Sequence, residues 1–281
     1  VIGAGWNGAR AFTATSGPGL SLMAEFLGLA YFAEIPVVLV DVQRSGPSTG
    51  MPTRTQQSDL LSAAYASHGD TKNIMLFPSD PKECFTITAQ AFDLAERLQT
   101  PVIIMSDLDL GMNEHISGDL NWDDTRKYDR GKVLTASQLE EMQTRWGRYL
   151  DTDKDGICYR TYPGTHPDKG VYFTRGTSHD EYSGYTEDST LYEKGMKRLL
   201  LKWETAKNLI PEPVIQPSPK ASAIGAIFFG TSAHAAKEAF DMLAKEDIHI
   251  NSMRLLSFPF QESVEKFLKE HQQIFIIEQN R

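Results

Sequence analysis

Apolar runs alternate with longer amphipathic stretches over residues 10–106. Short apolar runs predict strands at 10–15, 35–41, 73–77 and 101–107. Longer stretches predict helices at 19–34 and 82–98. Asp80 is placed as the N-cap of the second of these helices, with Pro81 in the first turn and Glu83 three residues on. Because buried strands that alternate with helices form parallel sheets covered on both faces, the pattern predicts an α/β fold.

The rest of the chain follows a different pattern. Residues 108–190 are polar and aromatic, rich in Gly and Asp, with few long apolar periods. A helix is predicted at 189–208, and PEPVIQPSPK at 211–220 is typical of a proline-rich linker. Beyond this linker the pattern predicts a second, smaller α/β unit, with strands at 223–230, 249–258 and 273–279 and helices at 232–245 and 261–270.

Composition and charge narrow the classes of protein. The chain has 281 residues, 41% of them hydrophobic, so it can bury a substantial core. A net charge of −9 without any basic run argues against a nucleic-acid surface. No apolar run approaches the roughly 18–20 residues of a membrane helix, and no signal peptide is found. The two cysteines, Cys84 and Cys158, suit neither a disulfide framework nor a CxxC motif and favour a reduced, cytoplasmic setting. Both ends are expected to be cut from a longer chain, since the sequence opens on Val1 within an apparent element.

Two loops rich in small and hydroxyl side chains follow predicted strands. One is TSGPG, formed by Thr15, Ser16, Gly17, Pro18 and Gly19. The other is DVQRSGPSTGMPTRT, residues 41–55. Because the carboxyl ends of parallel strands meet at one edge of a sheet, where ligands bind, we expect both loops there. TSGPG has two interpretations, a tight turn or a backbone that a ligand approaches. In the longer loop Arg44 offers a planar fork suited to a carboxylate, the alternative being a charged surface loop.

GAGWNG at 3–8 matches the G-x-G-x-x-G motif of dinucleotide-binding folds. In that fold a helix follows the glycines, and an acidic residue lies about 20 residues on. Here a strand pattern begins again at Arg10, and Glu25 falls within a helix. We therefore expect a close-packed helix end whose glycines admit a neighbouring backbone.

Three further polar motifs are weaker candidates. DTDKDG at 151–156 matches the first half of an EF-hand loop, but Tyr162 stands where a bidentate Glu is needed, so an Asp-rich turn is expected. HDEY at 179–182 has no thiol or further His nearby to complete a metal set. His68 and Asp70 either border the pocket of the two loops or form a capped loop, which we favour. No metal site is predicted.

One long segment resembles a known enzyme family. TATSGPGLSLMAEFLGLAYFAEIPVVLVDVQRSGPSTGMPTRTQQSDL, residues 13–60, is similar to the α subunit of the 2-oxoacid:ferredoxin oxidoreductases, which are thiamine-diphosphate, iron–sulfur enzymes. The similarity covers essentially the whole chain, continuing through the segments at 81–107, 155–165, 174–188 and 276–281. RSGPSTGMPT is highly specific to this family, whereas TSGPG is shared with thiamine enzymes such as acetolactate synthase.

The resemblance implies an α/β architecture in three parts. Residues 1–115 would form a parallel-sheet thiamine pyrimidine-binding domain that lacks its start. Residues 216–281 would belong to a transketolase C-terminal-like α/β domain that lacks its end. The connecting segment, 116–215, would dock between them. The family's activating Glu is expected upstream of Val1, so no catalytic acid or base is assigned, and the family's γ-type domain is absent as well.

The resemblance also implies roles for residues of the two loops. Arg44 and Thr53 would contact the 2-oxoacid substrate. Thiamine diphosphate would lie beside the residues of TSGPG, namely Thr15, Ser16, Gly17, Pro18 and Gly19. Arg54 and the remaining hydroxyl groups have no implied role.

The implied reaction is the oxidative decarboxylation of a 2-oxoacid, with 2-oxoglutarate favoured, to an acyl-CoA. Coenzyme A and ferredoxin would be the other reactants. The chain contains no GDG-type loop for Mg²⁺ and diphosphate and no clustered cysteines for an iron–sulfur cluster, so both are expected on a β subunit without which the chain is inactive. Two alternatives are a non-redox thiamine enzyme of the acetolactate synthase type and a non-catalytic subunit that scaffolds a partner's site.

Overall fold

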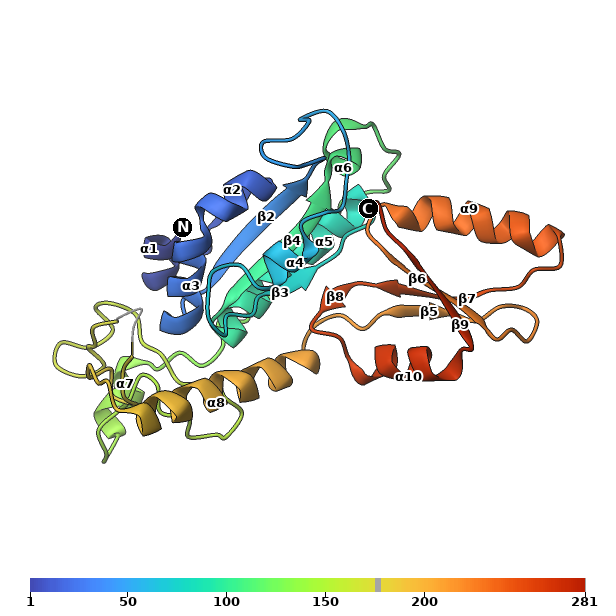
Figure 1. The fold of residues 1–281 in the computed structure, drawn as a ribbon. Coiled ribbons are helices and arrows are strands. Elements are labelled where there is room, and N and C mark those ends of the chain that lie inside the picture. The colour runs from blue at the N-terminus through green and yellow to red at the C-terminus, as the bar shows by residue number, and fades with distance from the viewer. Residues whose placement is uncertain (175–177, 281) are drawn as a thin grey trace.

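The chain folds around two sheets that lie side by side (Figure 1). The computed structural model describes residues 1–174 and 178–280. In this part of the chain the first sheet has five strands and the second has four. Residues 175–177, within the family-like segment at 174–188, lie outside the described residues. So does residue 281, the last of the predicted transketolase C-terminal-like domain.

The first sheet has the strand order β1-β2-β4-β3-β8. Its strands are β1 (Phe12–Thr15), β2 (Val37–Gln43), β3 (Ile74–Leu76), β4 (Pro101–Asp107) and β8 (Ser257–Phe258). The first four are mutually parallel, and β8 pairs antiparallel with β3. The parallel α/β sheet predicted from the apolar runs is therefore confirmed.

Helices cover both faces of the first sheet. One face packs against α2 (Gly17–Leu22), α3 (Ala24–Ala33) and α4 (Leu60–Ala64). The opposite face packs against α5 (Pro81–Leu98) and the end of α8 (Ser189–Lys207). Two short helices, α1 (Ile2–Trp6) and α6 (Leu108–Met112), flank this layer. The two apolar clusters on either side of the sheet bury the runs that predicted the strands.

The sequence pattern predicted the start of α5 correctly, but it did not predict that the helix expected at 19–34 is broken into two. The carboxylate of Asp80 accepts a hydrogen bond from the Glu83 N–H at 2.8 Å, as an N-cap does. The predicted helix at 19–34 is wrong as a single element, because the chain leaves helical geometry at Met23 (φ −95°, ψ −1°) and continues as α3. The segment is also less buried than its apolar composition indicates, since Leu22 and Phe26 are exposed.

The second sheet has the order β5-β7-β6-β9. Its strands are β5 (Val214–Gln216), β6 (Ile224–Phe229), β7 (Asn251–Leu255) and β9 (Gln273–Ile277). Helices α9 (Ser232–Lys245) and α10 (Glu262–Glu270) lie on opposite sides of it (Figure 1). The stretch predicted as a linker contributes β5, which pairs antiparallel with β7 at the edge of the sheet.

The two units share structure instead of meeting at a flexible joint. The strand predicted at 249–258 divides into β7, in the second sheet, and β8, which joins the first sheet beside β3. Arg254 on β7 forms an ion pair with Glu83 on α5 at 2.6 Å. Because backbone pairing and an ion pair both cross the boundary, the second unit is fixed against the first.

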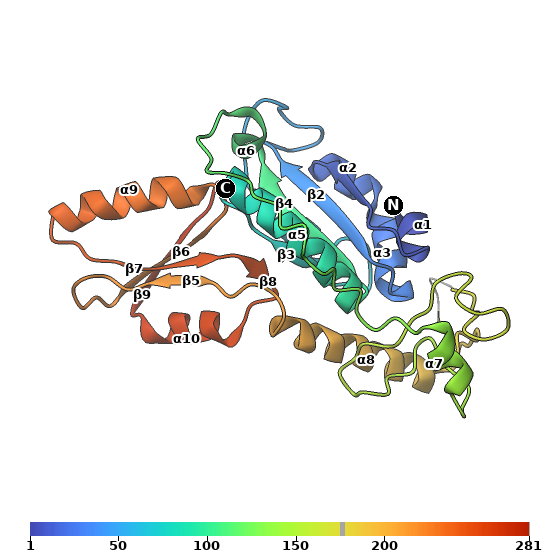
Figure 2. The ribbon, with the colours of Figure 1, turned by 180° about the vertical axis from the view of Figure 1, so that it is seen from behind.

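The first part of the connecting segment, which includes α7 (Ala136–Glu141) and which we call the middle segment, was expected to dock between the two units. It does not lie there. Figure 2 shows α7 and its loops at the far end of the first sheet, and α8 running back from them toward the second unit. The contacts agree, because Arg148 binds the carbonyl oxygen of Glu34 at 2.9 Å, just before β2 starts. This segment therefore covers the amino-terminal edge of the sheet.

A buried carboxylate anchors this end of the molecule. The Glu34 side chain is 0% exposed and pairs with Arg198 at 2.6 Å and with Lys202 at 2.8 Å, both on α8. Burial alone would raise the pKa of Glu34, but the two cations outweigh it and hold the pKa below its ordinary value. One carboxylate thus joins the end of α3 to α8.

No helix in the described ranges is both long enough and apolar enough to span a membrane.

Glu34→Ala is expected to destabilise the fold by about 3–5 kcal/mol, because it leaves two buried cations without their partner. The measurement is the midpoint of urea unfolding at pH 7, where Glu34 is ionised. Glu193→Ala is the matched control, because Glu193 forms an exposed ion pair with Lys197 on α8. Removing this exposed pair should leave the midpoint unchanged. Equal midpoints for the two variants would show that the buried pair does not anchor α8.

Candidate functional site

Two loops meet at the carboxyl-terminal edge of the first sheet. β1 ends at Thr15 and β2 at Gln43, and their parallel pairing sets Thr15 opposite Asp41. Since the two strands run in the same direction, both following segments leave the same edge (Figure 1). The placement predicted for TSGPG and for the longer loop is confirmed.

The longer loop, which we call the edge loop (residues 44–59), folds back on itself. The Ser45 N–H donates to the Arg54 carbonyl oxygen at 2.8 Å, and the Met51 N–H donates to the Ser45 carbonyl oxygen at 2.8 Å. Gly50 has φ +65°, and a Cβ there would lie 1.7 Å from the Ser45 carbonyl oxygen, so only glycine fits. These bonds bring the two ends of the loop together.

Folding of the edge loop makes neighbours of the segments that contain Arg44 and Thr53. Arg44 is half-buried, and its Nε lies buried without a hydrogen-bond partner in the described part of the chain. Thr53 is exposed. A guanidinium donor left without an acceptor, next to an exposed hydroxyl, is suited to a carboxylate-bearing ligand.

Arg54, to which the sequence assigned no role, has a local one. Its guanidinium donates to the carbonyl oxygen of Thr53 at 2.9 Å and to the Thr53 hydroxyl at 3.3 Å. Arg54 therefore orients Thr53 within the edge loop.

The TSGPG segment forms the start of α2. Thr15 ends β1, Ser16 is the N-cap without a side-chain capping bond, and Gly17, Pro18 and Gly19 open the helix. A Cβ on Gly17 would lie 2.6 Å from a carboxylate oxygen of Asp59, so the helix start packs directly on the end of the edge loop. The segment has no charged side chain, which suits a neutral heterocycle better than a phosphate.

Sequence reasoning missed a pair of acids beneath these loops. Asp41 is fully buried on β2, and its carboxyl group lies in hydrogen-bonding contact with that of Asp59, just before α4. Burial, and then the charge of Asp59, raise the pKa of Asp41 to about 8. An Asp at the end of an otherwise apolar strand pattern was the available signal.

A buried polar network ties the second unit to the base of the edge loop. One carboxylate oxygen of Asp107, at the end of β4, accepts from the Gln57 amide at 3.2 Å and from the Thr231 hydroxyl at 2.5 Å. The backbone N–H of Gln57 donates to the Gln279 carbonyl oxygen at 2.8 Å. These groups come from segments far apart in sequence, so no local sequence pattern predicts this network.

The remaining polar motifs lie away from this edge. His68 and Asp70 precede β3, so they lie at the amino-terminal edge, on a hollow with Glu25 and Phe32, and do not border the pocket of the two loops. In DTDKDG, Asp151 accepts from the Gly156 N–H at 2.9 Å, the bond of an Asp-rich turn.

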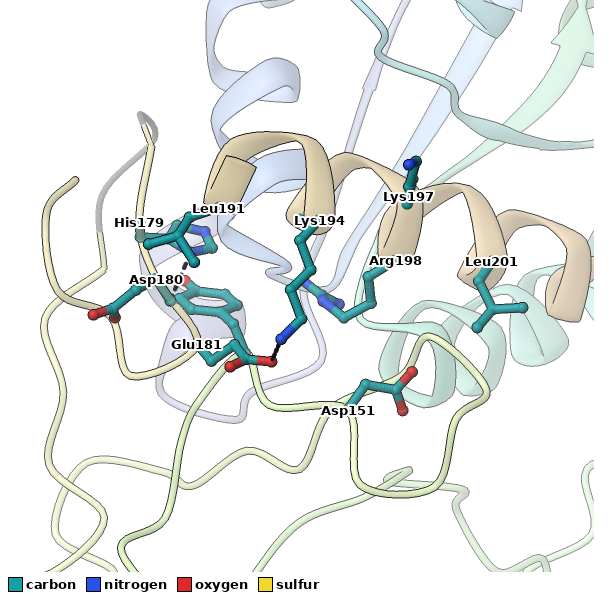
Figure 3. Close-up of a pocket in the computed structure, with 11 residues that line it drawn as sticks. Asp151, His179, Asp180, Glu181, Leu191, Lys194, Lys197, Arg198 and Leu201 are labelled. Atoms are coloured by element: carbon teal, nitrogen blue, oxygen red, sulfur yellow. Dashed lines mark hydrogen bonds and ion pairs between the residues drawn. The ribbon is translucent and has the colours of Figure 1, made fainter. Parts of the chain in front are cut away.

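Figure 3 shows a further hollow of about 370 Å³ between α8 and the middle segment. His179, from HDEY, lies on its wall and stacks on Tyr149 with ring centroids 3.6 Å apart. Lys194 pairs with Glu181 at 2.7 Å across the hollow. Lys194 and Glu181 neutralise each other, and Arg198 is engaged by Glu34, so this hollow is the weaker candidate for a ligand site.

The two thiols are poorly placed to ligate a cluster. Cys158 is fully buried, and burial raises its pKa to about 12. Burial likewise raises the pKa of Cys84 to about 11. Metal–sulfur clusters need thiolates, so neither cysteine is a suitable ligand in this fold.

The GAGWNG motif is a packing feature, as expected. It forms α1, and a Cβ on Gly5 would lie 2.4 Å from the carbonyl oxygen of Pro36. The glycine therefore admits the backbone that leads into β2, as a close-packed helix end does.

Comparison with known proteins shows the family of the chain. The family model described as "Pyruvate flavodoxin/ferredoxin oxidoreductase, thiamine diP-bdg" matches residues 1–145. Subunit alpha of 2-oxoacid:ferredoxin oxidoreductase 2 from Aeropyrum pernix is 36% identical over 100% of this chain and 43% of its own length. The 2-oxoglutarate synthase subunit KorA from Methanothermobacter marburgensis is 33% identical over 100% of this chain and 72% of its own length.

A solved structure is similar as well. The 2-oxoglutarate:ferredoxin oxidoreductase from Magnetococcus marinus, with 2-oxoglutarate, coenzyme A and succinyl-CoA bound, superimposes with a TM-score of 0.88 at 29% identity. The match covers 99% of this chain and 47% of that one. The chain thus spans about half the length of several of the proteins it matches.

Gly5→Ala is expected to destabilise the protein by about 1–3 kcal/mol, because the added methyl group would overpack the contact with Pro36. Gly3→Ala is the matched control in the same helix. A Cβ on Gly3 meets nothing within 4 Å, so the protein should be unchanged or more stable by up to about 1 kcal/mol. The midpoints of thermal unfolding measure both effects, and a neutral Gly5→Ala would contradict the packing role.

Proposed function

Because the chain belongs to the pyruvate flavodoxin/ferredoxin oxidoreductase family, we propose that it is part of the α subunit of a 2-oxoacid:ferredoxin oxidoreductase, with 2-oxoglutarate as the favoured substrate. The observation that carries the proposal is the superposition on an enzyme with 2-oxoglutarate, coenzyme A and succinyl-CoA bound. The edge loop supports it, because a carboxylate-bearing substrate needs the kind of donor that Arg44 offers.

The reaction we propose is the oxidative decarboxylation of the 2-oxoacid, with release of CO₂ and transfer of the acyl group to coenzyme A. An iron–sulfur cluster on another chain would carry the two electrons one at a time to ferredoxin. Thiamine diphosphate supplies the electron sink for the cleavage of the carbon–carbon bond when it is bound. The residues of this chain bind and orient the reactants.

Arg44 binds a substrate carboxylate in this proposal, and Thr53 donates a hydrogen bond to the substrate. The unpartnered Nε of Arg44 supports the first role, since a buried donor needs an acceptor. The second role is supported by Arg54, which holds the exposed Thr53 in place. Binding at both ends of the edge loop would orient the keto carbon toward the cofactor.

Thr15, Ser16, Gly17, Pro18 and Gly19 lie beside thiamine diphosphate in this proposal. The fit is to its aminopyrimidine half, because the segment carries no charge and the Ser16 hydroxyl is not used as a cap. The diphosphate with its Mg²⁺ would be held by another chain, which agrees with the lack of a GDG sequence here.

A β subunit completes the site in this proposal, and it brings the diphosphate site and the iron–sulfur cluster. The buried thiols support a cluster outside this chain. A partner surface is available on helices α2, α3 and α4, where large apolar side chains are exposed, namely Leu22, Phe26 and Leu61. Isolated thiols that stay reduced agree with a cytoplasmic location.

Arg44→Ala is expected to lower kcat/KM for 2-oxoglutarate roughly 10–150-fold, the cost of about 1.5–3 kcal/mol for a lost charge-assisted bond. The measurement is 2-oxoacid-dependent viologen reduction by the complete enzyme with its β subunit. Arg97→Ala is the control, because Arg97 is exposed and pairs with Asp129 away from the edge loop.

An unchanged kcat/KM in Arg44→Ala would overturn the substrate role. The same assay with a 2-oxoacid that has one carboxylate identifies the group that Arg44 binds. Equal losses with both substrates assign Arg44 to the carboxylate next to the keto group, and a loss confined to 2-oxoglutarate assigns it to the distal one.

A further inference from the structure

Two acids, fully buried Asp41 and half-buried Asp59, occupy the junction of the two loops of the site. Asp41 lies on β2, in register with Thr15 on one side and Met105 on the other. It shares the face of β2 that carries Leu39, the face covered by α2 and α4. Asp59 immediately precedes α4 and ends the edge loop. Asp41 therefore lies beneath the two loops, and Asp59 lies at their junction and is half-exposed.

Three of the four oxygens of the two carboxyl groups lack a donor in the described ranges, and the fourth, Oδ1 of Asp59, accepts from the Ser58 hydroxyl at 3.5 Å. Both oxygens of Asp41, which is 0% exposed, and Oδ2 of Asp59 are buried without a donor in the described ranges. The carboxyl group in hydrogen-bonding contact with Asp41 is that of Asp59. Two ionised carboxylates only accept, so this contact requires a proton between them.

Asp59 contacts both the end of β2 and the start of α2. Its backbone N–H donates to Oε1 of Gln43 at 3.2 Å, at the end of β2. Its carboxylate lies against the start of α2, where a Cβ on Gly17 would come within 2.6 Å of a carboxylate oxygen, so the contact leaves no room for another side chain. A carboxylate at the first N–H group of α2 is also favoured by the helix dipole.

We propose that Asp41 and Asp59 hold one shared proton and act as a positioning pair, which fixes the start of α2 against the end of the edge loop. In the shared state Asp41 donates to Asp59, and the Asp59 carboxylate packs on Gly17. On the proposed function, this sets the distance between the segment beside the aminopyrimidine and the loop that binds the 2-oxoacid. Neither acid touches substrate or exchanges a proton with it.

Among the described elements packed around Asp41, Asp59 is the neighbouring charged group. Helix α2 (GPGLSL) and helix α4 (LLSAA) have no titratable residue, and the strand neighbours Thr15 and Met105 are neutral. Asp59 is the charge that acts on Asp41, and with burial it raises the pKa of Asp41 to about 8. The proton is therefore held at pH 7 and lost above about pH 8. Two adjacent negative charges would then push α2 and the edge loop apart.

The first test is infrared spectroscopy of the complete enzyme without substrate or cofactor. The wild-type protein should show the carbonyl band of a protonated carboxylic acid at pH 7, and the band should disappear as the pH rises past 8. Asp41→Asn should remove the band at every pH. A wild-type spectrum without the band at pH 7 would overturn the proposal, even if the proposed reaction is correct.

The second test is the pH dependence of the Kd for thiamine diphosphate. In the wild type, Kd should rise above pH 8 by as much as about tenfold per pH unit, because binding favours the protonated pair. Asp41→Asn should abolish this rise, since its amide donates to Asp59 at all pH values. Asp80→Asn, at the N-cap of α5, should keep the wild-type rise.

Asp59→Asn separates positioning from simple loss of folding. It keeps the size of the side chain and offers an amide donor to Asp41, but it removes the negative charge that packs on the start of α2 at Gly17. It should weaken thiamine diphosphate binding at pH 7 and should also remove the acid band. An identical pH dependence of Kd in wild type and Asp41→Asn would show that the pair does not position the site.

Discussion

The parallel pairing of β1 with β2 is the constraint on which the rest of the site depends. It sets Thr15 beside Asp41, so the segment after β1 and the loop after β2 leave one edge of the sheet. A slip of one residue would turn every side chain of β2 to the opposite face. Asp41 and Gln43 would then lose their contacts with Asp59, and the start of α2 would lose its support on the edge loop.

The second unit also contacts the edge of the first sheet from which the edge loop leaves. β8 extends the first sheet, and Gln279, which follows β9, is hydrogen-bonded to Gln57 in both directions through backbone and side chain. Asp107 and Thr231 complete this contact in a buried setting, where hydrogen bonds are costly to break. The base of the edge loop is therefore a rigid interface between two units, and its tip, with Thr53, remains exposed.

Much of the fold could be predicted from the sequence because its signals are local. Buried strands appear as apolar runs, and the cap of α5 is readable from Asp80 and its neighbours. The break at Met23 and the transfer of β8 to the first sheet follow from tertiary packing, so no residue pattern marks them. The edge loop was found because ligand-binding loops follow parallel strands. The acid pair was missed because Asp41 and Asp59 meet only in the folded chain.

The distribution of charge in the site explains why one chain would not suffice for the proposed reaction. The start of α2 is neutral, Arg44 offers a guanidinium whose Nε has no partner among the described residues, and the acid pair carries one negative charge at pH 7. These groups can orient a carboxylate and a heterocycle, but they cannot neutralise a diphosphate or conduct electrons. On the proposed function, the charged half of the cofactor and the redox centre therefore belong on the surface that closes over α2 and the edge loop. The exposed apolar side chains of Leu22 and Leu61 lie on helices of that same face, so burying them would bring a partner to the site.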